Sequence, residues 1–386
     1  MAYLDHNATS PLRPEARAAM LAALDAGGNP SSVHAAGRRA RATLERARDA
    51  VAALTGAAAG DVVFTSGGTE ALALALGGAV AGTAEGGGRI SRLFVSAVEH
   101  PAVLANAAAV AKRAVGLRLE TVPVTVEGTV DLEALGLCLR EGNGRALVAV
   151  MAANNETGVI QPIEQVAALA KDAGALLLVD GVQAAGKIDL KTIAAAADYL
   201  ALSAHKLGGP SGAGALIVRE GAPFAPQILG GGQEKRRRAG TENLSGIAGF
   251  GAAASAAAGS LATEVPRLAA LRDRFERGML ALLPDLVIFG AAAPRLANTC
   301  LFAWAPMKAE TALMALDLEG VMVSSGAACS SGKVARSHVL EAMGVPEDLA
   351  ASALRVSFGW TSREDDVDAA LSAFEKLARR ASARAA

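Results

Sequence analysis

Cysteine is scarce in this chain, and neither sign of charge is in excess. Three cysteines among 386 residues are too few for a disulfide framework, which argues against a disulfide-stabilised extracellular domain and predicts a reducing, cytoplasmic location. Lysine and arginine total 37 against 38 acidic residues, so the formal charge is -1. The overall charge therefore favours binding neither to nucleic acid nor to an anionic membrane.

Long apolar runs are also missing. The chain starts with the polar segment 1–7, where a signal peptide would need an apolar stretch. The Ala/Gly-rich segment 249–259 is too short and too weakly apolar to span a bilayer. We therefore expect no membrane association.

Hydrophobic residues make up 52% of the chain, enough to bury a large core and to form two domains. Runs typical of β-strands alternate with alanine-rich segments of helical length, such as 70–80 and 162–173. This alternation predicts an α/β fold in which a mainly parallel sheet has helices on both faces. The predicted strands are 61–65, 92–97, 117–124, 145–151, 175–180, 199–203 and 214–219.

A change of composition near residue 256 predicts a second, smaller α+β domain that includes a long charged helix over 264–283. We assign residues 14–255 to the large domain and residues 1–13 together with 256–386 to the small one. Ligands of a sheet of this kind bind at the carboxyl ends of its strands. The polar motifs of the chain follow predicted strands, so they fall at that edge.

One of these motifs is Ser-Ala-His-Lys at 203–206, which ends in Lys206. Asp180 and Gln183 follow the strand before it. A pyridoxal phosphate (PLP) site needs a lysine amine to form a Schiff base with the cofactor aldehyde, and a carboxylate to pair with the ring nitrogen. A lone lysine after a strand is more often a surface residue. The residues that accompany Lys206, including Ser203 and His205, favour the PLP site.

The segment 66–70, Ser-Gly-Gly-Thr-Glu, stands between a predicted strand and a predicted helix. Backbone N–H groups at a helix N-terminus bind phosphate, Gly68 allows close backbone approach, and the Thr69 hydroxyl can add a hydrogen bond. A glycine-rich turn before a helix is common, so this motif indicates a phosphate site only together with the others.

Two further polar residues follow strands. His100 precedes Pro101, and its ring could stack on a cofactor ring and move protons; taken alone it reads better as a helix-entry residue. Asn155 lies in the turn Asn-Asn-Glu-Thr-Gly at 154–158, where its amide could orient the cofactor or a substrate carboxylate.

Cys329 lies in a run of small residues, 324–332, without the apolar neighbours that bury an inert thiol. This composition predicts an exposed, mobile loop that moves the thiol between different positions. Cys138 and Cys300 stand in apolar stretches and are predicted to be small core residues. Arg355 is a charge inside a strand pattern. It either reaches out to solvent or grips a substrate α-carboxylate with its guanidinium group.

Taken together, these motifs resemble the cysteine desulfurases of the iron–sulfur-assembly and nitrogen-fixation type, which belong to the fold-type I, class V aminotransferase-like PLP enzymes. The resemblance covers essentially the whole chain. It is carried by the segments 3–9, 28–34, 65–70, 154–158, 203–206, 230–234 and 238–243, by the Cys329 loop and by Arg355.

The resemblance implies a role for each motif. Lys206 would hold PLP, Asp180 would pair with the ring nitrogen, Gln183 with the phenolic oxygen, and His100 would stack on the ring. The phosphate would be held by Gly68, Thr69, Ser203 and His205, with Thr241 contributed by the partner subunit of a homodimer. Asn155 and Arg355 would bind the substrate, L-cysteine.

Cys329 would accept the substrate sulfur as a persulfide, with His100 as a candidate base, and pass it to an iron–sulfur scaffold or another acceptor protein. L-Alanine would be the product, and the resting enzyme would hold no metal. The long loop after Cys329 is similar to that of the group that serves scaffold proteins. Lys333 to Arg336 differ from the family pattern, as does His6 near the N-terminus.

Two other interpretations stay open at this point. One is a different class V PLP enzyme, such as a selenocysteine lyase or a small-substrate aminotransferase, although an aminotransferase has no need of Cys329. The other is a scaffold that keeps the fold without the chemistry, against which the presence of both Lys206 and Cys329 argues.

Overall fold

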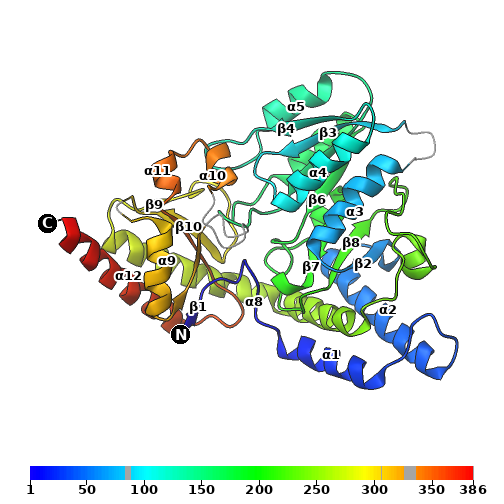
Figure 1. The fold of residues 1–386 in the computed structure, drawn as a ribbon, viewed down its shortest axis with the longest axis horizontal. Helices are drawn as coiled ribbons and strands as arrows, with labels where there is room; N and C mark the ends of the chain where they lie inside the picture. Colours follow the sequence, from blue (N-terminus) through cyan, green and yellow to red (C-terminus); the bar gives the residue numbers. More distant parts are fainter. Residues whose placement is uncertain (83–87, 306, 326–335, 386) are drawn as a thin grey trace.

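The computed structural model describes residues 1–82, 88–305, 307–325 and 336–385, and Cys329 lies outside these ranges. The chain forms two lobes (Figure 1). The larger lobe contains the helices from α1 to α7, and the smaller one contains the helices from α9 to α12. The helix bounds in the larger lobe are α1 Pro14–Ala26, α2 Ala35–Thr55, α3 Gly68–Ala81, α4 Pro101–Arg113, α5 Leu132–Arg140, α6 Ile163–Asp172 and α7 Lys191–Ala196.

A seven-stranded sheet forms the centre of the larger lobe within the described residues, in the order β2-β8-β7-β6-β5-β3-β4. Neighbouring strands are parallel from β4 to β7, and β8 is antiparallel to both of its neighbours. The strands are β2 Val62–Thr65, β3 Ile90–Ser96, β4 Arg118–Val122, β5 Arg145–Met151, β6 Leu176–Asp180, β7 Tyr199–Ser203 and β8 Gly214–Val218. The predicted α/β fold with a mainly parallel sheet is confirmed, and each predicted strand overlaps an observed one.

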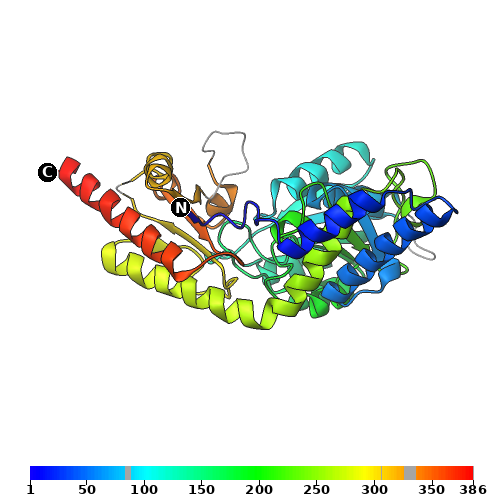
Figure 2. The ribbon, with the colours of Figure 1, turned by 90° about the horizontal axis from the view of Figure 1, so that it is seen from below.

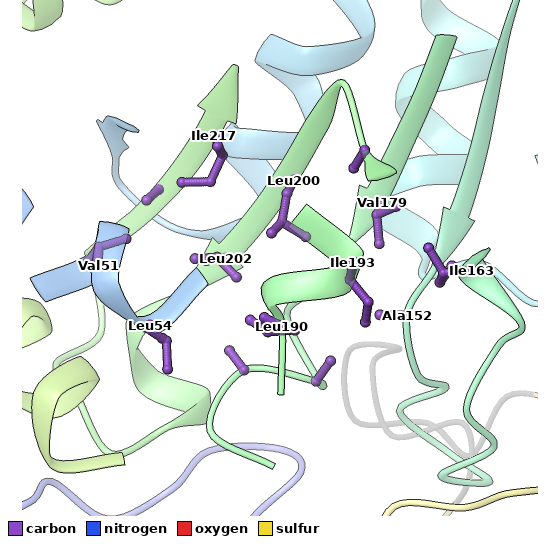
Figure 3. Close-up of a cluster of buried hydrophobic side chains, with 14 of the residues drawn as sticks. Val51, Leu54, Ala152, Ile163, Val179, Leu190, Ile193, Leu200, Leu202 and Ile217 are labelled. Atoms are coloured by element: carbon purple, nitrogen blue, oxygen red, sulfur yellow. The ribbon is translucent and has the colours of Figure 1, made fainter. Parts of the chain in front are cut away.

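Hydrophobic side chains cover both faces of this sheet. One buried cluster joins the sheet to α2, α5, α6, α7 and α8, and a second joins it to α3 and α4. Figure 3 shows part of the first cluster, in which Val179 and Leu202 pack at the carboxyl ends of β6 and β7. Asp180 and Ser203 directly follow these anchored residues, so the packing of the core fixes where the two polar side chains lie.

The smaller lobe is built on an antiparallel sheet, in the order β12-β13-β10-β9. Phe275, Phe302, Phe358 and Phe374 form an aromatic cluster in its core. The N-terminal strand β1 (Ala2–Tyr3) pairs with β11 of this lobe, and the chain then runs toward the larger lobe. The remaining elements are β9 Val287–Ile288, β10 Thr299–Ala303, β11 Val321–Met322, β12 Ser324–Ser325, β13 Ala353–Ser357, α9 Ala309–Leu318, α10 His338–Ala342, α11 Glu347–Ala350 and α12 Glu364–Ala385.

Helix α8 (Leu244–Leu282) is much longer than the helix predicted over 264–283, and it extends along both lobes (Figure 2). The side chain of Asn243 caps its start by accepting a hydrogen bond from the N–H of Gly246. The Ala/Gly-rich first half is stabilised by close packing on α2, since a Cβ atom at Gly251 would lie only 2.6 Å from the Cα of Ala47. The predicted domain boundary at residue 255 falls inside α8, and the division into domains stays a prediction.

The length of α8 also changes the argument about membranes. By length and composition, α8 is the one helix of the described residues that could cross a bilayer. The shortness of segment 249–259 therefore does not exclude a membrane-spanning helix. Half of its most apolar window is buried inside the protein, as in the core helix of a globular domain.

Candidate functional site

A cavity of about 350 Å³ opens at the carboxyl ends of the parallel strands. Its wall combines the start of α3, the residues that follow β3, β5, β6 and β7, the N-terminal segment, and one residue of β13. The sequence-predicted residues that line it are Gly68, Thr69, His100, Asn155, Asp180, Gln183, Ser203, His205, Lys206 and Arg355. A larger groove between α1, α2 and α8 is lined mostly by alanine and lacks comparable chemistry.

Two predicted residues are not part of this wall. Thr241 lines a separate depression beside Phe64, Arg238 and Asn243 of the same chain. Its predicted role at the site of a partner subunit is untested by a single chain. Cys329 lies outside the described residues, so its predicted position stays a prediction.

Lys206 ends the short 3-10 helix η2 (Ala204–Lys206), which directly follows β7. Its amine donates hydrogen bonds to the carbonyl oxygens of Asn7 and Ala8, both at 2.7 Å. The N-terminal segment therefore forms one side of the site and holds the lysine amine in place. Segment 3–9 carried part of the family resemblance, but sequence reasoning assigned none of its residues to the site, because nothing in residues 7–8 indicates which strand they approach.

A second lysine, Lys187, lies next to this centre and was missed by sequence reasoning. Its amine donates to Oδ1 of Asn7 at 2.9 Å and to Oε1 of Gln183 at 2.7 Å. Burial lowers the pKa of Lys187 well below its ordinary value, and the charges of Lys206 and Arg355 lower it further. The four-residue spacing between Gln183 and Lys187 is a sequence signal that could have indicated this contact.

Asp180 is the last residue of β6, and its Oδ1 accepts a hydrogen bond from the N–H of Val182 at 2.9 Å. Burial raises the pKa of Asp180 to about 6, while the hydrogen bond from Val182 and the charge of Lys206 lower it. Glu99 is also buried, and its Oε1 accepts from the N–H of Met151, the strand partner of Asp180. Burial, and then the charge of Asp180, raise the pKa of Glu99 well above its ordinary value.

His100 is both the helix-entry residue and a residue of the cavity wall. Its Nδ1 accepts a hydrogen bond from the N–H of Ala102 and so caps α4, in which Pro101 is the first residue. Burial, and then the charges of Lys206 and His338, lower the pKa of His100 to about 4. The ring is therefore neutral at pH 7, and its proton is on Nε2 because Nδ1 is an acceptor. In this state its Nε2–H can donate a hydrogen bond, and the predicted role of His100 as a base stays a prediction.

Arg355 does not reach out to solvent, since only 3% of its surface is exposed. Its Nη2 donates to Oδ1 of Asp5 at 2.6 Å and its Nη1 to the carbonyl oxygen of Asn155 at 2.9 Å. Its Nε is buried and has no acceptor among the described residues. A buried donor without an acceptor is costly, so the site is suited to bind an anionic group here. Asp5 was not foreseen, because 350 residues separate it from Arg355.

Glu156 links the turn at 154–158 to the start of α10. Its buried Oε2 accepts a hydrogen bond from the Ser337 hydroxyl at 2.6 Å. The neighbouring His338 contacts the carbonyl oxygen of Glu99 through Nε2 at 2.9 Å. Burial raises the pKa of Glu156 to about 7, against lowering by Ser337 and Arg355. Residues 337 and 338 are thus held by the chain neighbours of two residues of the cavity wall, Asn155 and His100.

The raised pKa predicts a pH-dependent stability for the Glu156→Gln variant. Glu156 binds its proton more tightly in the folded chain than in the unfolded chain, where its pKa has the ordinary value of 4.5. Its contribution to stability is therefore full below that pH and is lost as the pH rises through about 7. Glutamine stays neutral, so urea denaturation should show equal unfolding free energies near pH 4 and an advantage of up to about 3 kcal/mol for the variant near pH 8. The exposed Glu164→Gln is the control, and an advantage for Glu156→Gln that did not change with pH would contradict the argument.

The comparisons with known proteins agree with this geometry. The family model described as aminotransferase class V matches residues 2–370. A cysteine desulfurase of Cereibacter sphaeroides is 45% identical over 363 residues, covering 93% of this chain and 91% of the relative. A NifS-like protein from Rickettsia africae is 34% identical with a TM-score of 0.87, covering 98% of this chain and 99% of that structure. A structure of SspA in complex with cysteine is 25% identical with a TM-score of 0.78, covering 93% of this chain and 99% of that one.

Proposed function

The chain belongs to the class V aminotransferase family, as the resemblance of its motifs predicted, and on this premise we propose that it is a cysteine desulfurase. The observation that carries the proposal is the joint presence of Lys206, Asp180 and Arg355 in the wall of one cavity that also includes the start of α3. The named relatives favour this activity over a selenocysteine lyase or a small-substrate aminotransferase.

The cavity fits PLP. Helix α3 begins after Gly67 with no side-chain cap among the described residues, so the N–H groups of its first turn can receive a phosphate. The phosphate would lie against Gly68, Thr69, Ser203 and His205. Asp180 would pair with the ring nitrogen and Gln183 with the phenolic oxygen. When bound, the cofactor supplies an electron sink for the bond broken at the substrate Cα atom.

Residues of this chain would bind the substrate and move its protons. Lys206 is held by two backbone carbonyls of the N-terminal segment, and its amine would take the Cα proton of L-cysteine. His100 presents a neutral ring with its proton on Nε2, which suits it to donate a hydrogen bond and to stack on the cofactor. The α-carboxylate would be bound by Arg355, beside the Asn155 amide.

Cys329 would take the substrate sulfur. Its thiolate would attack the sulfur atom of the bound cysteine, so that the S–S bond of a persulfide forms while the bond between that sulfur and Cβ breaks. The electron pair would stay with the three-carbon fragment, which takes up a proton at Cβ and leaves as L-alanine. The persulfide would then pass to a sulfur-acceptor protein, such as an iron–sulfur scaffold. We further propose a cytoplasmic homodimer, in which Thr241 of each subunit serves the phosphate site of the other, and the predicted division into domains at residues 13 and 255.

The proposal is tested with the purified protein, L-cysteine and a thiol reductant. We expect a protein with a visible absorption band of bound PLP that forms L-alanine and sulfide in equal amounts. Conversion that requires a keto acid would indicate an aminotransferase instead. Turnover of selenocysteine without turnover of cysteine would indicate a lyase.

The Arg355→Lys variant tests the binding of the carboxylate. Lysine keeps the positive charge but loses the planar guanidinium that contacts Asp5 and Asn155 while offering a further N–H. We expect KM for L-cysteine to rise about 10- to 100-fold, because one or two charge-assisted hydrogen bonds to the carboxylate are lost. The change in kcat should be smaller. Steady-state kinetics measure the effect, with the exposed Arg363→Lys as control. An unchanged KM would exclude Arg355 as the carboxylate-binding residue.

A further inference from the structure

The Lys187 amine is the centre of a hydrogen-bond network behind the cavity. It donates to the side-chain oxygens of Asn7 and Gln183, while Lys206 donates to the main-chain oxygen of Asn7. Lys187 does not line the cavity that contains Lys206 and Gln183, although it shares a smaller pocket with Lys206. Lys187 can therefore influence the cavity only through the side chains that it contacts, those of Asn7 and Gln183.

The orientation of the Asn7 amide follows from its hydrogen-bond partners, because each of them can act only as an acceptor or only as a donor. Its Nδ2 donates to the carbonyl oxygen of Asn155 at 3.2 Å, and a carbonyl oxygen has no proton to give. The Asn298 Nδ2 donates to the carbonyl oxygen of Phe358 and also to Oδ1 of Asn7 at 3.1 Å. Oδ1 of Asn7 is thus the acceptor that faces Lys187.

The Gln183 amide is held in the same way at both ends. Its Nε2 donates to the main-chain oxygen of Asn7 at 2.9 Å, and its Oε1 accepts from Lys187. An amide nitrogen carries two protons, and one of them remains for the cavity that Gln183 lines. Burial keeps the pKa of Lys187 low, and even the neutral amine has the two protons that these two bonds need. The network therefore presents an N–H of Gln183, and not its oxygen, to the cavity.

We propose that Lys187 is a positioning residue that holds the Gln183 amide with its nitrogen toward the cavity and so sets the proton affinity of the cofactor site. This inference rests on the proposed function. A donor at the phenolic oxygen of PLP stabilises negative charge there and lowers the affinity of the cofactor centre for its proton. Without Lys187, the buried Oε1 of Gln183 loses its partner and turns toward other donors, which removes the N–H from the phenolic oxygen.

The test is a pH titration of the visible absorption band of the holoenzyme. In the Lys187→Met variant we expect the titration midpoint to rise by about one pH unit, the effect of losing one hydrogen bond. The control Lys191→Met, an exposed lysine of α7, should titrate as the wild type does. The charged and titratable groups that line the cavity beside Gln183 are kept in every variant, namely His100, Asp180, His205, Lys206 and Arg355.

A double-mutant cycle separates positioning from simple loss of charge. If Lys187 acts through Gln183, then Lys187→Met should shift the midpoint little in a Gln183→Ala background. An equal shift in both backgrounds, or no shift in the single variant, would overturn the inference. Should Lys187→Met fail to fold, Lys187→Gln replaces it. The amide of the new glutamine keeps a donor for Oε1 of Gln183. The titration midpoint of this variant should therefore lie within a few tenths of a pH unit of the wild-type value, and a shift of about one pH unit would count against positioning. A wild-type protein without a visible band would instead refute the proposed function itself.

Discussion

The Lys206→Ala variant is expected to lose the visible absorption band and to form L-alanine from L-cysteine at least about 10³-fold more slowly than the wild type. Among the described residues, Lys206 supplies the one lysine amine that lines the cavity beside Asp180, and alanine can neither hold the cofactor nor take the Cα proton. Absorption spectra and alanine assays measure the two effects. The exposed Lys191→Ala serves as the control for general damage.

Lys187 makes this test more stringent than the sequence suggested. Its amine is bonded to the same Asn7 as that of Lys206, so it is the nearest candidate for a substitute. Any residual turnover of Lys206→Ala should therefore disappear when Lys187→Met is added. Normal alanine formation by Lys206→Ala would remove the central claim of the proposed function.

The Cys329→Ser variant is expected to keep bound PLP and yet to release no sulfide, because serine cannot form a persulfide. The other two cysteines are poor substitutes. Cys300 is only 1% exposed in β10, and burial raises the pKa of its thiol well above the ordinary value. Cys138 lies half-buried in α5, where burial and the charges of Glu120 and Glu141 raise its pKa. A thiol with a raised pKa forms less of the nucleophilic thiolate.

Sulfide release with a reductant measures this effect, and the retained absorption band shows that the cofactor site is intact. The variants Cys138→Ser and Cys300→Ser are the controls and should release sulfide at close to the wild-type rate. If Cys329→Ser kept its activity and one of these controls lost it, the carrier would have to be reassigned to that cysteine.

Local sequence patterns were sufficient for the strands of the larger lobe and for the residues that follow them. Asp180, Ser203 and Lys206 could be predicted because each follows a run of buried β-type residues, and the carboxyl ends of parallel strands meet at one edge. The turn before α3 was visible for the same reason. The prediction failed for the start of α8, because an Ala/Gly-rich helix is stabilised by the surfaces it packs on rather than by its own amphipathic pattern.

The tertiary structure alone decided which groups surround these residues. Lys206 meets the carbonyls of Asn7 and Ala8, Arg355 meets Asp5, and Glu156 meets Ser337, each across more than 150 positions of the chain. No local pattern encodes such pairs, because they depend on the return of the N-terminal segment between the lobes and on the place of β13 beside β10. The residue types of the site could thus be predicted from the sequence. Their protonation and orientation follow from burial and from partners that only the folded chain brings together.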